Sequence, residues 1–278
     1  MKKGLRIAII IILSAVFVVS LVKVVQSSLE YRKGASAYAE AEDIANIGEI
    51  KTDRSAAERR KDDSTHAAEP DIDEDPSDSK QSDPVAEAML DADMPALREI
   101  NGDVEGWILL PDTGISYPVV QGSDNDYYLD HNWKKEASSV GSVFLDCRCS
   151  ADFTDFNTII YGHRMKNGSM FAGLKYYAKQ DYLESHPNIY IRTGDKIFIY
   201  NIYAAYEAAV GSITYNIEFP NDEARAEFID HGLQNSAIDA GAAPSPSDSF
   251  ITLITCTGRD YSSRWVVQAV LSGAALSE

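Results

Sequence analysis

Eight short runs of β-branched and aromatic residues, separated by turn-forming segments, restrict the fold of this chain more than any other feature. Strands this short and this closely spaced are typical of a closed β-barrel or a β-sandwich. Apolar residues recur at helical spacing over 221–235, so we expect an amphipathic helix between the sixth and seventh strands. The expected strands are 107–110, 116–121, 142–145, 158–161, 189–192, 196–206, 250–256 and 265–271.

The N-terminal end carries an apolar run over 7–25 that is long enough to cross a bilayer. Its only charge, Lys23, lies near the end of the run, where a long side chain can reach the interface. Two lysines and an arginine precede the run and predict a cytoplasmic N-terminus. A cleavable signal peptide is the alternative, but no Ala-x-Ala site closes the run. We therefore expect 1–26 to be a membrane anchor and the rest of the chain to lie outside the cell.

A segment over 27–84 separates this anchor from the β-rich region. Its first part, to about residue 50, has weakly helical spacing and predicts a continuation of the anchor helix. Between residues 62 and 83 nine acidic residues stand against one lysine, with few apolar residues, so we expect a disordered acidic stalk. A folded domain over 85–278 follows and should begin with two short helices, 85–90 and one capped by Asp93.

Composition excludes some classes of function. The formal net charge is −18, from 43 acidic and 25 basic residues, and no basic cluster appears in the body of the chain. This charge argues against a nucleic-acid partner, because phosphate binding needs a basic surface. Only three cysteines occur, so a disulfide framework does not hold the fold together.

A thiol and a guanidinium are predicted to meet at one end of the β-rich domain. The expected strand 250–256 ends at Cys256, a short polar connection follows, and the next strand begins after Arg264. Two antiparallel neighbours would hold these side chains close together. Taken alone, the same pattern fits a buried structural cysteine and a surface arginine. A catalytic interpretation needs a base or a positive neighbour, because an ordinary thiol is mostly protonated at neutral pH.

Among the histidines, His163 is the best candidate for that base. It follows an apolar strand that stops at Gly162, so its imidazole should emerge at a strand end. With Cys256 and Arg264 it completes a nucleophile, a proton carrier and a fixed cation, which are the groups that acyl transfer requires. The others have ordinary settings in the stalk, a polar loop, a turn and a helix: His66, His131, His186 and His231.

Cys147 and Cys149 are the remaining thiols. Their spacing predicts that they lie on one side of a strand, but a metal site would need further cysteine or histidine ligands, so we expect no metal there. A disulfide between them would close a strained small ring, so we expect free thiols.

Residues 252–256 (TLITC) resemble the signature of sortases, the membrane-anchored cysteine transpeptidases that attach proteins to Gram-positive cell walls. His163 and Arg264 resemble the catalytic histidine and arginine of that family, and the similarity extends over most of 95–272. Further segments are similar to the class B branch: 101–108, 117–121, 125–129, 161–165 and 221–235.

This resemblance implies a closed eight-stranded sortase barrel and a two-step reaction without a cofactor. Cys256 would attack the Thr carbonyl of a C-terminal sorting motif in a secreted protein, while His163 protonates the departing amine. An amine of a peptidoglycan precursor or crossbridge would then attack the thioester. Arg264 would hold the oxyanion, with Arg259 as a weaker candidate.

The family positions also imply a substrate groove. One departure from class B is the isoleucine at the variable position before Thr255, where a small polar residue is common. Two other interpretations remain at this stage: a cysteine endopeptidase that uses water as the acceptor, and a non-catalytic binding barrel tethered to the membrane. The implied groove residues are Asn125, Leu129, Tyr161, Ile254, Thr255 and Thr257.

Overall fold

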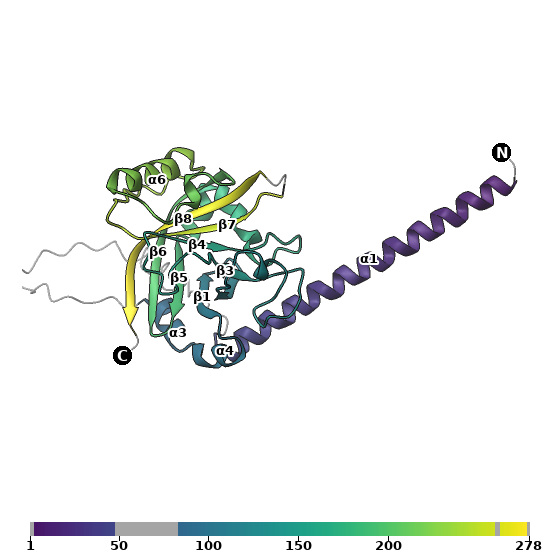
Figure 1. Cartoon of the computed structure of the whole chain (residues 1–278), viewed down its shortest axis with the longest axis horizontal. Coiled ribbons are helices and arrows are strands. Elements are labelled where there is room, and N and C mark those ends of the chain that lie inside the picture. The colour runs from purple at the N-terminus through teal and green to yellow at the C-terminus, as the bar shows by residue number, and fades with distance from the viewer. Residues whose placement is uncertain (1–2, 48–82, 259–261, 277–278) are drawn as a thin grey trace, which may run out of the picture.

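The computed structural model describes residues 3–47, 83–258 and 262–276, and it contains a closed eight-stranded barrel (Figure 1). The strand order is β1-β2-β3-β4-β7-β8-β6-β5, and β1 pairs with β5 to close the barrel. The pairs β2–β3 and β4–β7 are parallel, whereas the others are antiparallel. The expected mostly β fold and closed barrel are therefore confirmed. The strands are β1 Val104–Leu110, β2 Ile115–Val120, β3 Val143–Leu145, β4 Asn157–Tyr161, β5 Asn188–Thr193, β6 Lys196–Ala209, β7 Phe250–Cys256 and β8 Ser263–Leu276.

The barrel closes around an apolar interior, as the β-branched and aromatic runs require. Trp107 of β1, Tyr200 of β6 and Leu253 of β7 have no exposed surface. The predicted strand 265–271 is longer in the structure, since β8 pairs with β6 from Ser263 to Leu276. This long pair passes beside β7, so it supports the strand that ends at Cys256.

The three helices expected in the folded domain are present, and the predicted N-cap Asp93 is confirmed. Asp83 accepts from the backbone at the start of α3 (Pro84–Leu90), Asp93 at the start of α4 (Met94–Ile100), and Asn221 at the start of α6 (Asp222–Asn235). Such caps satisfy N–H groups that a helix leaves unpaired. Four shorter elements were not predicted: α5 Gln180–Ser185 and the 3₁₀ segments η1 Tyr127–Leu129, η2 Phe171–Ala178 and η3 Ile213–Tyr215.

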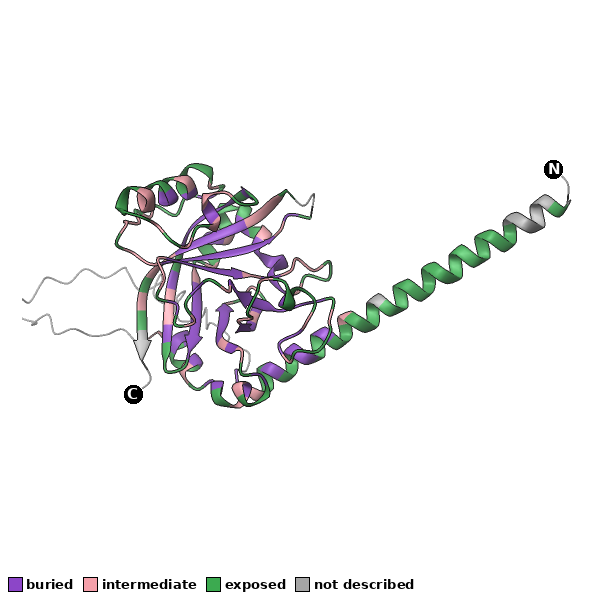
Figure 2. Ribbon diagram, viewed as in Figure 1, coloured by how far each residue is buried: buried purple, intermediate pink, exposed green. Residues whose placement is uncertain are grey.

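Helix α1 (Lys3–Ile44) leaves the barrel as a single rod (Figure 1). Its residues 10–26 are exposed, whereas Ala37, Tyr38 and Ala41 are buried against the barrel (Figure 2). Over 10–44 it has the length and composition of a membrane-crossing helix, and an 18-residue window within it has a mean hydropathy of 2.3. The helical continuation expected after the anchor is therefore present, and its last turns contact the domain. The predicted acidic stalk lies mostly in 48–82, outside the described residues.

Candidate active site

The end of the β7–β8 pair brings a thiol and a guanidinium together. Cys256 is the last residue of β7, and its partner in the antiparallel register is Arg264 of β8. The Arg264 Nη1 donates to the carbonyl oxygen of Ser263 at 2.9 Å. Paired strands lie about 5 Å apart, so the register itself places the two side chains at one barrel end. Arg259, the weaker oxyanion candidate, lies outside the described residues.

His163 reaches the same point from β4, which runs parallel to β7. The Gly162 N–H donates to the Ile254 carbonyl at 3.1 Å, so the next residue lies beside the end of β7. There the His163 imidazole and the Cys256 thiol are close enough for each group to shift the pKa of the other. Glycine is needed before the histidine, because a Cβ at residue 162 would lie 2.7 Å from the Phe171 ring. The thiol and the guanidinium therefore come from β7 and β8, and the imidazole comes from the segment that follows β4.

The charges of these groups support one another. The hydrogen bond to Cys256 raises the pKa of His163, and the Leu129 carbonyl acts in the same direction, whereas burial opposes it. In return, the hydrogen bond to His163 lowers the pKa of the Cys256 thiol despite burial, with help from the positive charges of Arg264 and Arg164. Both shifts favour the charged forms relative to the isolated groups, and the thiolate is the nucleophilic form of cysteine.

A cleft of about 380 Å³ opens over Cys256. Its volume lies within the usual range of ligand sites, about 300–1,000 Å³. It brings together most of the residues that the sequence singled out. Thr257 is the exception: it is buried and lies outside the lining. The lining residues among the predicted ones are Asn125, Leu129, Tyr161, His163, Ile254, Thr255, Cys256 and Arg264.

Strand alternation explains why the threonines differ from Cys256. Successive side chains in a strand point to opposite faces, so Ile254 and Cys256 share one face of β7. The Thr255 hydroxyl turns the other way and is buried without a hydrogen-bond partner among the described residues. Thr255 therefore lies at the edge of the cleft without offering its hydroxyl there.

Tyr215 is a cleft residue that the sequence did not single out. It lies at the end of η3, in the connection between β6 and α6, and lines the cleft with Phe144 and Val210. Its hydroxyl is buried and has no hydrogen-bond partner among the described residues. Burial raises the pKa of Tyr215, while the charge of Arg264 opposes that shift. An isolated tyrosine in a 3₁₀ turn carries no periodic signal, so only the fold could identify it.

The other thiols lie in a different setting from the predicted one. Cys147 and Cys149 follow β3 in a turn, so the expected position on one side of a strand was wrong. The chain has turned away from the strand direction at Asp146. Both thiols are free, and burial raises the pKa of Cys149 to about 12. Cys149 is therefore a buried thiol that burial keeps in its protonated form.

Comparisons with known proteins agree with this geometry. Residues 108–272 match the sortase domain family. Sortase B of Listeria monocytogenes is 41% identical over 177 residues, which cover 63% of this chain and 72% of that protein. Sortase B of Staphylococcus aureus is 32% identical over 161 residues, which cover 58% of this chain and 66% of that protein.

A solved structure described as a Staphylococcus aureus sortase B–substrate complex has the same architecture. Its TM-score is 0.61 at 31% identity, over 64% of this chain and 83% of that one. The family match covers more than half of the chain, and the barrel, the relatives and the sequence resemblance agree. The chain belongs to the sortase family of cysteine transpeptidases, and within that family to class B.

Proposed function

We propose that this sortase cleaves a C-terminal sorting motif of secreted proteins at a Thr carbonyl and transfers the protein to a cell-wall amine. The observation that carries the proposal is the meeting of Cys256, His163 and Arg264 at one cleft. These groups supply a nucleophile, a proton carrier and a fixed positive charge. The family membership supports the choice of a peptide carbonyl as the electrophile.

In the first step the Cys256 thiolate attacks the Thr carbonyl carbon, and the carbonyl π electrons move to the oxygen. Arg264 stabilises this oxyanion, since a guanidinium remains charged at any working pH. When the oxyanion collapses, the peptide C–N bond breaks and His163 donates its proton to the departing amine. The products are a thioester on Cys256, a neutral imidazole and the free C-terminal fragment.

In the second step a primary amine attacks the thioester. The neutral His163 takes the proton that the amine loses, and the C–S bond breaks to release the thiolate. The new amide joins the protein to its acceptor, and the imidazolium–thiolate pair is restored. The cleft residues Asn125, Leu129, Tyr161, Ile254 and Thr255 would contact the sorting peptide, with Thr257 behind the nucleophile.

We also propose that 1–26 anchors the enzyme in the membrane with its N-terminus in the cytoplasm. On this proposal 27–84 is the connecting segment and 85–278 is the catalytic domain outside the cell. The long apolar helix and the basic residues before it support this arrangement. It would place the cleft on the same side as secreted clients and the cell wall.

The full-length chain in detergent tests the reaction directly. It is incubated with a library of pentapeptides that each contain one Thr, with and without triglycine as an amine, and the products are identified by mass spectrometry. We expect cleavage after Thr and an amide adduct when the amine is present. Cys256→Ala should form no product, while Cys147→Ala keeps the activity. Products of hydrolysis alone, at every amine concentration, would identify an endopeptidase and overturn the proposed transfer.

A further inference from the structure

An ion pair with a buried carboxylate lies behind the wall of the cleft. The Asp146 side chain has no exposed surface, whereas the Arg148 side chain is 55% exposed. Arg148 binds both carboxylate oxygens, with Nε 2.9 Å from Oδ1 and Nη2 2.7 Å from Oδ2, and its backbone N–H donates to Oδ1 at 3.0 Å. Such a two-pronged contact fixes the carboxylate in one orientation.

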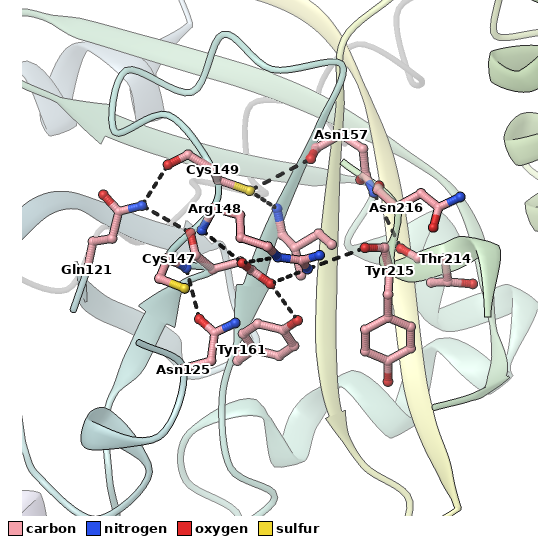
Figure 3. Close-up of polar contacts among 12 residues, drawn as sticks. Gln121, Asn125, Cys147, Arg148, Cys149, Asn157, Tyr161, Thr214, Tyr215 and Asn216 are labelled. Carbon is pink, nitrogen blue, oxygen red and sulfur yellow. Dashed lines mark hydrogen bonds and ion pairs between the residues drawn. The ribbon is translucent and has the colours of Figure 1, made fainter. Parts of the chain in front are cut away.

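The same ion pair holds three residues that line the cleft (Figure 3). The Tyr161 hydroxyl donates to Asp146 Oδ2 at 2.9 Å. The Asn125 Oδ1 accepts at 2.8 Å from the N–H of Cys147, the residue after Asp146, and the Asn125 side chain helps to lower the pKa of the Asp146 carboxyl. Arg148 Nη2 donates to the carbonyl oxygen of Tyr215 at 3.4 Å. The groove wall is therefore oriented by one charged pair that itself stays out of the cleft.

Stability alone gives little reason for an ion pair at this place. Removing a carboxylate from water is costly, and apolar side chains of similar size often stabilise a core equally well. The carboxylate does, however, determine which hydrogen-bonding groups face the peptide. The Tyr161 hydroxyl donates its only proton to Asp146. Its oxygen can therefore only accept a hydrogen bond from a ligand.

We propose that Asp146, fixed by Arg148, is a positioning residue that sets the affinity of the cleft for the sorting peptide through Tyr161 and Asn125. The inference rests on the proposed peptide cleavage. On this inference Asp146 affects peptide binding and leaves the reactivity of Cys256 unchanged. The contacts of Asp146 with Arg148 and Tyr161 are separate from those of Cys256. This separation distinguishes positioning from a general loss of structure.

The test is steady-state kinetics of the full-length Asp146→Asn variant on the best-cleaved pentapeptide of the library. The variant keeps the size of the side chain but loses the charge that holds Arg148. We expect KM to rise about tenfold, the size of one hydrogen-bond contribution, with kcat within about twofold. The rate at which iodoacetamide alkylates Cys256, followed by peptide mapping, should not change. Asp155→Asn is the matched control, because that carboxylate binds Ser150 in the same loop and should leave KM unchanged.

Coupling to Tyr161 gives the second measurement. In a Tyr161→Phe background, which lacks the hydroxyl, Asp146→Asn should raise KM less than it does in the wild type. If Asp146→Asn does not fold, Arg148→Lys takes its place, since lysine keeps the charge without the two-pronged contact and should also raise KM. A wild-type KM in the folded variant, or a fall in kcat and in Cys256 alkylation at unchanged KM, would overturn the inference. A wild-type enzyme that cleaves no library peptide would instead refute the proposed function, and the inference with it.

Discussion

The Nε2 atom of His163 lies 2.6 Å from the carbonyl oxygen of Leu129. A carbonyl oxygen can only accept, so Nε2 carries a proton, and the Nδ1 side of the ring remains for the Cys256 thiol. Leu129 lines the cleft, and its backbone carbonyl also contacts the His163 ring. The contact connects the end of η1 to His163.

Gly141 leaves room for this contact between His163 and the Leu129 carbonyl. The first prediction concerns the effect of replacing Gly141. Its φ is +62°, and a Cβ there would lie 2.6 Å from the Leu129 oxygen and 2.8 Å from His163 Cδ2. Gly141→Ala should therefore displace the imidazole, and a misplacement of about 1 Å can cost about 100-fold in kcat. Gly114→Ala is the control, because Gly114 also has a positive φ, of +73°, but open space around it. The measurement is the kcat of both variants on the library peptide. Equal losses of kcat in the two variants would assign the effect to backbone strain alone.

The second prediction concerns the pH at which Cys256 becomes a thiolate. The hydrogen bond to His163 is the main reason that the thiol pKa is lowered, so His163→Ala should move it back up toward the ordinary value. The midpoint of iodoacetamide alkylation against pH, measured in a Cys147→Ala background, should rise. His231→Ala, on helix α6, should leave the midpoint where it is. An unchanged midpoint in His163→Ala would contradict the charge pairing.

The same pair predicts the pH dependence of turnover. At low pH the Cys256 thiolate is protonated, and at high pH the His163 imidazolium loses the proton that the leaving amine needs. Since the pKa of the thiol is lowered and that of the imidazole is raised, the two active forms coexist over a wider window than ordinary values allow. A profile of kcat/KM against pH should fall on both sides of that window. In Arg264→Lys the acidic limb should stay in place, because a cation remains, while the rate falls.

The fourth prediction concerns stability in acid. Burial alone would raise the pKa of Asp146, but Arg148, the Tyr161 hydroxyl and the Asn125 amide outweigh it and hold the pKa below its usual range. A lowered folded-state pKa contributes stability above the unfolded-state pKa, and this contribution is lost as pH falls through the folded value. Asp146→Asn should therefore cost about 1–3 kcal/mol in urea unfolding at neutral pH, and less as the pH falls. Glu227→Gln, an exposed site on α6, is the control. A difference that stays constant with pH would assign the loss to packing instead.

Local sequence patterns predicted the strands and the meeting of Cys256 with Arg264, because a short connection between two strands forces an antiparallel pair. The parallel pairing of β4 with β7 has no local signal, since nearly the whole of the domain's second half separates them. His163 could therefore be chosen for its place at a strand end, but its hydrogen bond to the thiol could not be derived. The family resemblance supplied that link.

The contacts that support the site could not be predicted from the sequence for a different reason. The carbonyl of Leu129 belongs to the backbone, which every residue has, so no residue type marks it. Asp146 and Arg148 look like ordinary loop charges in the sequence, and only the packing of β3 and β4 buries the carboxylate beside Tyr161. Tyr215 reaches the cleft from a single 3₁₀ turn. Sequence patterns identify helices, strands and reactive residues. Tertiary packing determines which groups hold those reactive residues in place.

Helix α1 also contacts the loop between η1 and β3, which packs against His163, and this contact leads to the last prediction. The Tyr38 hydroxyl donates to the Gly141 carbonyl at 2.5 Å, and the Trp133 indole N–H donates to the Ala37 carbonyl at 2.7 Å. The C-terminal part of α1 is therefore hydrogen-bonded to the loop that contains Gly141, and Gly141 lies against His163. A helix that serves only to tether the domain would not need these bonds.

Tyr38→Phe removes the bond to Gly141 and keeps the ring that packs edge-on against Tyr117. We expect the free energy of unfolding to fall by about 1 kcal/mol, because a buried carbonyl loses its hydroxyl partner. We also expect kcat to fall while KM changes little, since Gly141 orients the base and not the peptide. Tyr31→Phe, two turns earlier on the same helix and only half-buried, is the matched control. Urea unfolding and library-peptide kinetics on the full-length chain measure both effects. A stability loss with wild-type kcat would show that α1 supports the fold without acting on the catalytic site.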